Sequence, residues 1–199
     1  MTKTRLEAFS DGVIAILITI MILELKTPHG ATWDALAPVL PSFLTYVLSY
    51  IYLGIYWTNH HHMIHATERI SGSVLWANLH LLFWLSLVPF TTGWMGENHN
   101  APLPTAVYGA VLVLAAIAYT ILQARIIAVQ GPHSKLATAV GSDRKGKISI
   151  VLYLIAIPAA FVHQLISDLL YVTVALIWLV PDRRIESRLT DESHSSHAS

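Results

Sequence analysis

The sequence predicts an all-α, polytopic membrane protein with six transmembrane helices in each subunit. Of its 199 residues, 54% are hydrophobic and 12% are charged, whereas about 25% are charged in an ordinary soluble domain. The apolar residues form blocks close to the roughly 20 residues that a helix needs to cross a bilayer. A soluble domain could not cover its surface with so few charges, so we expect the chain to lie in a lipid bilayer.

Four apolar blocks have the length of a single span, and a fifth is long enough for two. We expect spans at residues 4–25, 33–59, 73–94 and 104–129, and two short spans within residues 148–180. The last stretch holds about 33 residues, which is too many for one crossing. A polar cluster at His163, Gln164, Ser167 and Asp168 lies near its middle, where we expect the chain to fold back. A single long, tilted span is the alternative for this stretch.

The basic residues predict the orientation of these spans. With six spans, eleven of the twelve Lys and Arg residues fall on one side of the membrane, and Lys26 alone falls on the other. Short loops rich in Lys and Arg stay in the cytoplasm, so we expect a multi-pass protein of the cell membrane with both termini cytoplasmic. Residues 1–182 would form the transmembrane domain, and the charged, then Ser- and His-rich residues 183–199 a disordered cytoplasmic tail.

Polar side chains stand in the first turns of the first expected span, among them Ser10 and Asp11. Such groups inside a membrane usually face a bundle interior or an ion path and have a partner. Asp11 could act as a proton or ion relay, or as an anchor bonded to neighbouring helices. Its candidate partners are Arg5, the run His60, His61 and His62, Asn78 and His80. We favour an anchor shared with a histidine of the second span and Asn78, because Arg5 lies on a different face of the same helix.

A helical wheel at about 100° per residue separates this span into two faces. Ser10 and Asp11 fall on one side. The opposite side carries a row of uncharged residues, which are Ile16, Thr19, Ile20 and Leu23. A row of this kind in a membrane helix usually packs against lipid or a neighbour, and lining a narrow apolar pore is the other interpretation.

Most other kinds of chemistry are disfavoured by the sequence. His61 and His65 have the i, i+4 spacing of metal ligands, but no Cys or Glu ligand and no HExxH motif accompanies them, so we expect no metal site. No nucleophile elbow, phosphate-binding loop or dinucleotide motif is present, so we expect neither an enzyme nor a cofactor. The formal net charge is zero, which gives no indication of a nucleic-acid partner. The potassium-filter sequence TVGYG is also missing.

The pattern R-x-x-x-F-S-D at Arg5, Phe9, Ser10 and Asp11, followed by Gly-Val-Ile-Ala-Ile, resembles the signature of the transmembrane protein 175 family, the lysosomal potassium channel and its bacterial relatives. Later landmarks agree with this resemblance. They are Trp57 with the His cluster, Asn78-Leu79, and Ser86-x-x-Pro89-Phe90. The match is specific over the first three expected spans and only architectural beyond them, and a single six-span repeat looks like the bacterial form.

The resemblance implies a homotetramer that conducts K⁺ passively through a pore lined by the first helix of each subunit, with K⁺ as the permeant ion and no cofactor. Carried onto this sequence, the constriction falls on Ile16, Ile20 and Leu23, with Thr19 contributing to selectivity. The resemblance also implies a structural network, which we place at Arg5, Phe9, Ser10, Asp11, His60, His61 and Asn78.

Two other functions stay open from the residues alone. A proton-coupled small-solute transporter would use Asp11 and a histidine of the second span as its relay. Transporters often show paired repeats and broken helices at the midplane, and neither is evident here. A structural membrane protein without transport activity is the third interpretation, and it predicts indifference to changes at Ile16 and Leu23.

Overall fold

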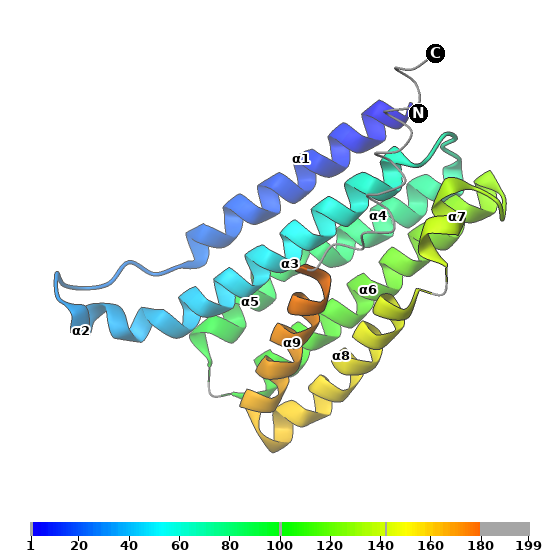
Figure 1. Cartoon of the computed structure of the whole chain (residues 1–199). Coiled ribbons are helices and arrows are strands. Elements are labelled where there is room, and N and C mark those ends of the chain that lie inside the picture. The colour runs from blue at the N-terminus through cyan, green and yellow to red at the C-terminus, as the bar shows by residue number, and fades with distance from the viewer. Residues whose placement is uncertain (1, 100, 142, 180–199) are drawn as a thin grey trace, which may run out of the picture.

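The computed structural model describes residues 2–99, 101–141 and 143–179, and all the regular secondary structure in these ranges is helical (Figure 1). The predicted disordered tail, residues 183–199, lies outside them. The helices are α1 (Lys3–Met21), α2 (Trp33–Leu36), α3 (Leu40–His65), α4 (Gly72–Ser86), α5 (Val88–Glu97), α6 (Pro102–Gln130), α7 (Lys135–Val140), α8 (Arg144–Val162) and α9 (Gln164–Leu179). A short 3-10 helix, η1 (Ile22–Glu24), continues α1, and another, η2 (Ala37–Val39), joins α2 to α3.

Five of the described helical segments are long and apolar enough to cross a membrane, and these are Lys3–Glu24, Trp33–His65, Gly72–Glu97, Pro102–Gln130 and Arg144–Val162. The first four correspond to the first four predicted spans. The second runs six residues past its predicted end at residue 59, so the histidine run lies inside α3 rather than at its end. The helix α9 is apolar but has only 16 residues, which is shorter than the other segments.

The stretch 148–180 folds back on itself, as expected, and the turn lies at His163. Ser167 Oγ donates to the Ala156 carbonyl at 2.6 Å, and Trp178 Nε1 donates to Ser149 Oγ at 2.8 Å. These two pairs place α8 and α9 side by side and antiparallel. The alternative of one long, tilted span is therefore wrong.

The third expected span is interrupted between α4 and α5, where Leu87 separates the two helices. Pro89 lies within the first two positions of α5, where it lacks the N–H that would continue the hydrogen-bond ladder. The helix resumes because Thr91 N donates to the Leu87 carbonyl at 3.1 Å. The segment from Gly72 to Glu97 is therefore long and apolar enough to cross a membrane as one span.

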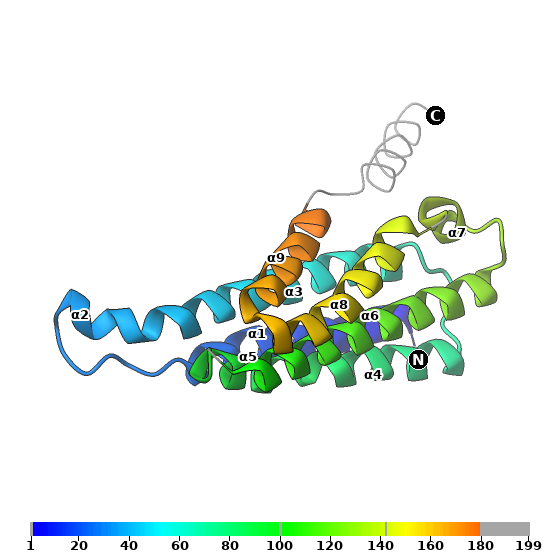
Figure 2. The ribbon, with the colours of Figure 1, turned by 90° about the horizontal axis from the view of Figure 1, so that it is seen from below.

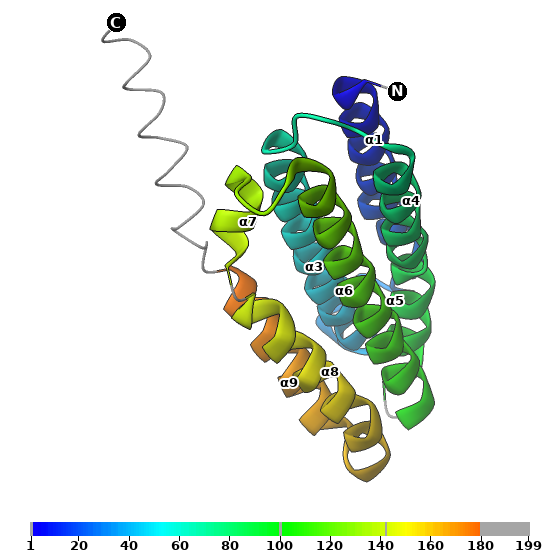
Figure 3. The same cartoon turned by 90° about the vertical axis from the view of Figure 1, so that its right-hand side faces the viewer.

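The hydrophobic core of the described chain consists of two clusters. The first joins α1 to α3, α4 and α6 through aliphatic side chains such as Leu6, Ile14, Leu53 and Leu81. The second joins α3, α6, α8 and α9, and its largest members are tyrosines: Tyr52, Tyr108, Tyr153 and Tyr171. As a result α1 lies at one side of the subunit and the α8–α9 hairpin at the other, with α3 and α6 between them (Figures 1, 2 and 3).

Gly109 allows α9 to pack closely on α6, and replacing it by Ala should destabilise the fold. An added Cβ would lie against the Tyr171 hydroxyl and 3.0 Å from its Cζ. The Tyr171 hydroxyl donates to the Thr105 carbonyl at 2.9 Å, so the ring is held in place. We expect Gly109→Ala to lower the free energy of unfolding by about 1–3 kcal/mol through overpacking, measured as a lower melting temperature in detergent.

Gly54 supplies the matched control, because a Cβ added there meets nothing within 4 Å. Gly54→Ala should leave stability unchanged or raise it slightly, since Ala is the better helix former. Equal losses at both glycines would show that the Gly109–Tyr171 contact is not tight.

Candidate ion pathway and its supporting network

The helix α1 has one buried face and one exposed face. The buried face consists of Leu6, Ser10, Ile14, Leu17 and Met21. Three of the four residues predicted for the pore constriction lie on the exposed face of α1, where Ile16 is 57% and Ile20 40% exposed and Thr19 is exposed as well. The fourth, Leu23, lies in η1, which continues α1, and is 79% exposed. The row that the wheel separated is therefore uncovered in the single subunit.

The Thr19 hydroxyl is turned back onto its own helix. It donates to the Ile16 carbonyl at 2.9 Å and lies 3.2 Å from the Ala15 carbonyl. A hydroxyl that donates within its helix keeps an acceptor oxygen on the exposed side. Thr19 can thus offer the lone pairs of its hydroxyl oxygen to a cation.

A buried chain of hydrogen bonds fixes the opposite face of α1. Asn78 Nδ2 donates to Ser10 Oγ at 3.0 Å, and Ser10 Oγ donates to the Leu6 carbonyl at 2.9 Å. His60 Nε2 lies 2.7 Å from Asn78 Oδ1, and it must be the donor because an amide oxygen only accepts. All three side chains are fully buried. This network ties α1, α3 and α4 together and sets the rotation of α1.

Asp11 has a different partner from the one predicted. Its Oδ1 accepts a hydrogen bond from Trp57 Nε1 at 3.0 Å, whereas His60 and Asn78 are bonded to Ser10. The predicted sharing of Asp11 with a histidine and Asn78 is therefore wrong, and the role of Asp11 as an anchor stays a prediction. Ser10 occupies that place because it lies one residue earlier, on the side of α1 that faces α4.

The contact between Asp11 and Trp57 is one of three along the same seam between α1 and α3. Lys3 Nζ donates to the His65 carbonyl at 2.6 Å, and His61 Nδ1 lies 3.1 Å from Glu7 Oε1. On α1 the three residues are spaced four apart, and their partners on α3 are spaced four apart in the reverse order. This antiparallel seam was not predicted, although the i, i+4 spacing in both segments is visible in the sequence.

Two residues of the predicted network, and one candidate partner of Asp11, take no part in these hydrogen bonds. Arg5 and Phe9 are on the exposed face of α1, on the same side as Ile16. His80 accepts a hydrogen bond from Trp84 Nε1 at 2.9 Å and so does not serve Asp11. Within the described ranges, no group of three or more His, Cys, Asp or Glu side chains is placed to hold a metal ion.

Removing the Asp11 carboxylate should loosen the seam between α1 and α3. We expect Asp11→Ala to lower the free energy of unfolding by about 1–2 kcal/mol, because the Trp57 donor loses its acceptor. Asp11→Asn keeps an oxygen at the same position and should cost less. The readouts are the melting temperature in detergent and the fraction of assembled protein in size-exclusion chromatography.

Asp34, exposed at the start of α2, provides the control for loss of an aspartate, and Asp34→Ala should change neither readout. If Asp11→Asn were as damaging as Asp11→Ala, the charge rather than the hydrogen bond would matter, which would favour the relay interpretation.

Comparisons with known proteins agree with this arrangement. Residues 5–89 match the family model described as the endosomal/lysosomal potassium channel TMEM175. A potassium channel from Chryseobacterium sp. is 55% identical over 191 residues, which cover 96% of this chain and 100% of the relative. A potassium channel from Streptomyces collinus is 37% identical over 126 residues, 59% of this chain and 61% of that one.

One solved structure is similar to this chain in both fold and sequence. The crystal structure of a lysosomal potassium-selective channel TMEM175 homolog from Chamaesiphon minutus superposes with a TM-score of 0.78 at 26% identity, covering 90% of this chain and 97% of that one. The family match covers the segment that carries R-x-x-x-F-S-D, the buried Ser10–Asn78–His60 chain and the break between α4 and α5. This chain is a membrane protein that belongs to the TMEM175 family.

Proposed function

We propose that this chain is the subunit of a homotetrameric, potassium-permeable channel that lets K⁺ cross the cell membrane passively. The observation that carries the proposal is the asymmetry of α1, whose polar face is bonded to α3 and α4 while its aliphatic row is left uncovered. The relatives named above are potassium channels, which supports K⁺ as the permeant ion.

Assembly is required because one α1 helix cannot enclose a pore. A closed ring of four subunits would bring four copies of the exposed row around one axis. With a rise of about 1.5 Å per residue, the rings of Ile16, Ile20 and Leu23 would be stacked over roughly 10 Å. Narrow rings of apolar side chains resist wetting and can therefore both gate and filter. Thr19, between two of these rings, would add an oxygen.

The proposed subunit has six spans, with α8 and α9 as the last two and both termini in the cytoplasm. The helix α9 would extend about 24 Å, somewhat short of the roughly 30 Å hydrocarbon core, so the bilayer must thin or the hairpin must sit toward one side. Lys26, the lone basic residue on the outer side, forms an ion pair with Glu97 at 2.8 Å. The positive charge of Lys26, which departs from the positive-inside pattern, is thus balanced by the negative charge of Glu97.

The transporter alternative is not favoured. It requires a proton relay between Asp11 and a histidine of α3, whereas Asp11 is bonded to Trp57, and His60 to Asn78. A passive channel needs neither an enzymatic step nor a cofactor, only the permeant ion.

The experiment that tests the proposal is a flux assay on purified protein in liposomes. Potassium-loaded vesicles containing the protein should lose K⁺ down its gradient without ATP and without a proton gradient, and protein-free vesicles should not. Tetrameric, folded protein that passes no K⁺ would contradict the channel, and accumulation of a solute driven by a proton gradient would establish the transporter instead.

A further inference from the structure

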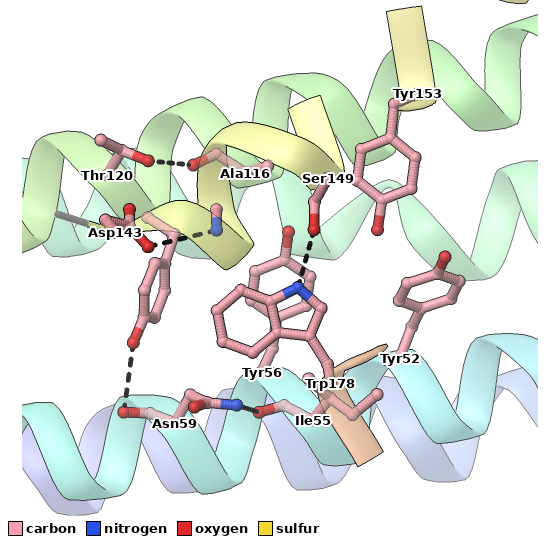
Figure 4. A pocket seen from close by; sticks show the side chains of 12 residues that line it. Tyr52, Ile55, Tyr56, Asn59, Ala116, Thr120, Asp143, Ser149, Tyr153 and Trp178 are labelled. Atoms are coloured by element: carbon pink, nitrogen blue, oxygen red, sulfur yellow. Dashed lines mark hydrogen bonds between the residues drawn. The ribbon is translucent and has the colours of Figure 1, made fainter. Parts of the chain in front are cut away.

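A small cavity lies between α3, α6 and the α8–α9 hairpin (Figure 4). Figure 3 shows α1 on the other side of α3 and α6 from that hairpin. Aromatic rings from four helices form most of its wall, and these are Tyr52, Tyr56, Tyr119, Tyr153 and Trp178. The volume of the cavity is about 40 Å³. Since one water needs roughly 10–15 Å³ by this measure, the space suits an occupant of about three non-hydrogen atoms.

The polar groups that face the cavity have unused hydrogen-bonding capacity. Tyr56 is only 9% exposed and lines the cavity. Asn59 donates its amide to the Ile55 carbonyl at 2.8 Å, which leaves its side-chain oxygen available. The oxygens of Tyr56 and Asn59 can therefore accept hydrogen bonds from an occupant of the cavity.

Asp143 brings a negative charge to the same wall (Figure 4). It precedes α8 and caps that helix through one oxygen, which accepts from Gly146 N at 3.1 Å. A carboxylate has two oxygens and can accept several bonds. Its capacity is therefore only partly used by the cap.

The ring of Trp178 lies close to a positively charged side chain of the protein itself. The Lys145 ammonium lies 5.9 Å from the centre of the Trp178 ring, within the range of a cation–π interaction. The indole N–H of Trp178 is occupied by Ser149 Oγ, so the ring offers its faces rather than its donor. Trp178 and Tyr rings around a carboxylate are the surroundings in which proteins bind ammonium ligands.

We propose that this cavity binds a small alkylammonium cation of the size of ethylammonium. The ammonium group would donate to the Asp143 carboxylate and to the oxygens of Asn59 and Tyr56, while the alkyl carbons would lie against the aromatic rings. Water alone would form hydrogen bonds with the oxygens of Asn59 and Tyr56. It would supply neither an apolar group for the aromatic rings nor a positive charge for the Asp143 carboxylate. A ligand with about three non-hydrogen atoms cannot bind more tightly than roughly millimolar.

The test is ¹⁹F NMR of the full-length protein labelled with 5-fluorotryptophan in detergent, with the Trp178 signal assigned by Trp178→Phe. Titration with ethylammonium chloride should shift the Trp178 resonance saturably, with a Kd of about 1–30 mM, and should leave the Trp57 resonance unmoved. Ethanol, which has the same number of non-hydrogen atoms but no charge, should bind at least tenfold more weakly. Potassium chloride at equal ionic strength should have no saturable effect.

Matched variants separate ligand binding from a merely structural role. Asp143→Asn keeps a helix-capping oxygen but removes the charge, and it should weaken ethylammonium binding about tenfold. Tyr56→Phe keeps the ring and should weaken binding several-fold, whereas Tyr50→Phe on the exposed side of α3 should not change it. Equal titrations with ethanol and ethylammonium, or unchanged binding in both Asp143→Asn and Tyr56→Phe, would overturn the proposal. None of these readouts depends on ion conduction.

Discussion

Replacing Ile16 or Leu23 by Asn is expected to raise the potassium conductance about tenfold, which corresponds to roughly 1.4 kcal/mol off the permeation barrier. In the proposed assembly each substitution is applied four times around one axis, so an apolar ring becomes a hydrated one. Water then fills the constriction more readily, and the barrier that dewetting imposes falls. Because a wider, wetter ring interacts with both ions similarly, discrimination between K⁺ and Na⁺ should fall as well.

The measurements are the single-channel conductance in symmetrical K⁺ and the reversal potential in bilayers with K⁺ on one side and Na⁺ on the other. Ile18→Asn is the control, since Ile18 is partly buried against the first core cluster and a polar group there disturbs packing. Ile22 is a poorer control because it is 46% exposed. If Ile18→Asn shifted selectivity while Ile16→Asn and Leu23→Asn did not, α1 would be rotated differently and the pore assignment would fail.

The second large effect is expected at Asn78. Asn78→Ala removes the amide that joins Ser10 to His60, leaving the buried Ser10 oxygen without its donor and the buried His60 N–H without its acceptor. Each unsatisfied buried group costs about 1–3 kcal/mol, so we expect a loss of about 2–4 kcal/mol in stability. Because the same bonds set the rotation of α1, assembly should fail together with folding. Melting temperature and native mass spectrometry measure the two effects.

Asn98 is the matched control, since it is exposed at the end of α5 and its side chain donates to the Trp94 carbonyl of the same helix. Asn98→Ala should leave melting temperature and assembly unchanged. An Asn78→Ala protein that melts and assembles like Asn98→Ala would show that the buried chain contributes little. The double variant Ser10→Ala, Asn78→Ala should be less damaging than the sum of its single changes, because the two groups share one bond.

The sequence predicted the features that depend on local pattern. Span positions follow from length and hydropathy, and five helical segments of sufficient length lie near the predicted places. The two faces of α1 follow from helical periodicity, which needs no knowledge of neighbours. The resemblance carried by Arg5, Phe9, Ser10 and Asp11 led to the family that the comparisons support. The role of Ile16, Thr19, Ile20 and Leu23 in permeation stays a prediction.

The tertiary structure decided which side chains meet. Asp11 bonds Trp57 rather than a histidine, and Ser10 rather than Asp11 joins Asn78, because the outcome depends on the rotation and offset of helices far apart in the chain. A shift of one residue turns a helix by about 100°, which exchanges the neighbours of adjacent positions. The same holds for the aromatic cavity, whose walls come from α3, α6, α8 and α9. No local pattern in any one of these helices encodes where the other three lie.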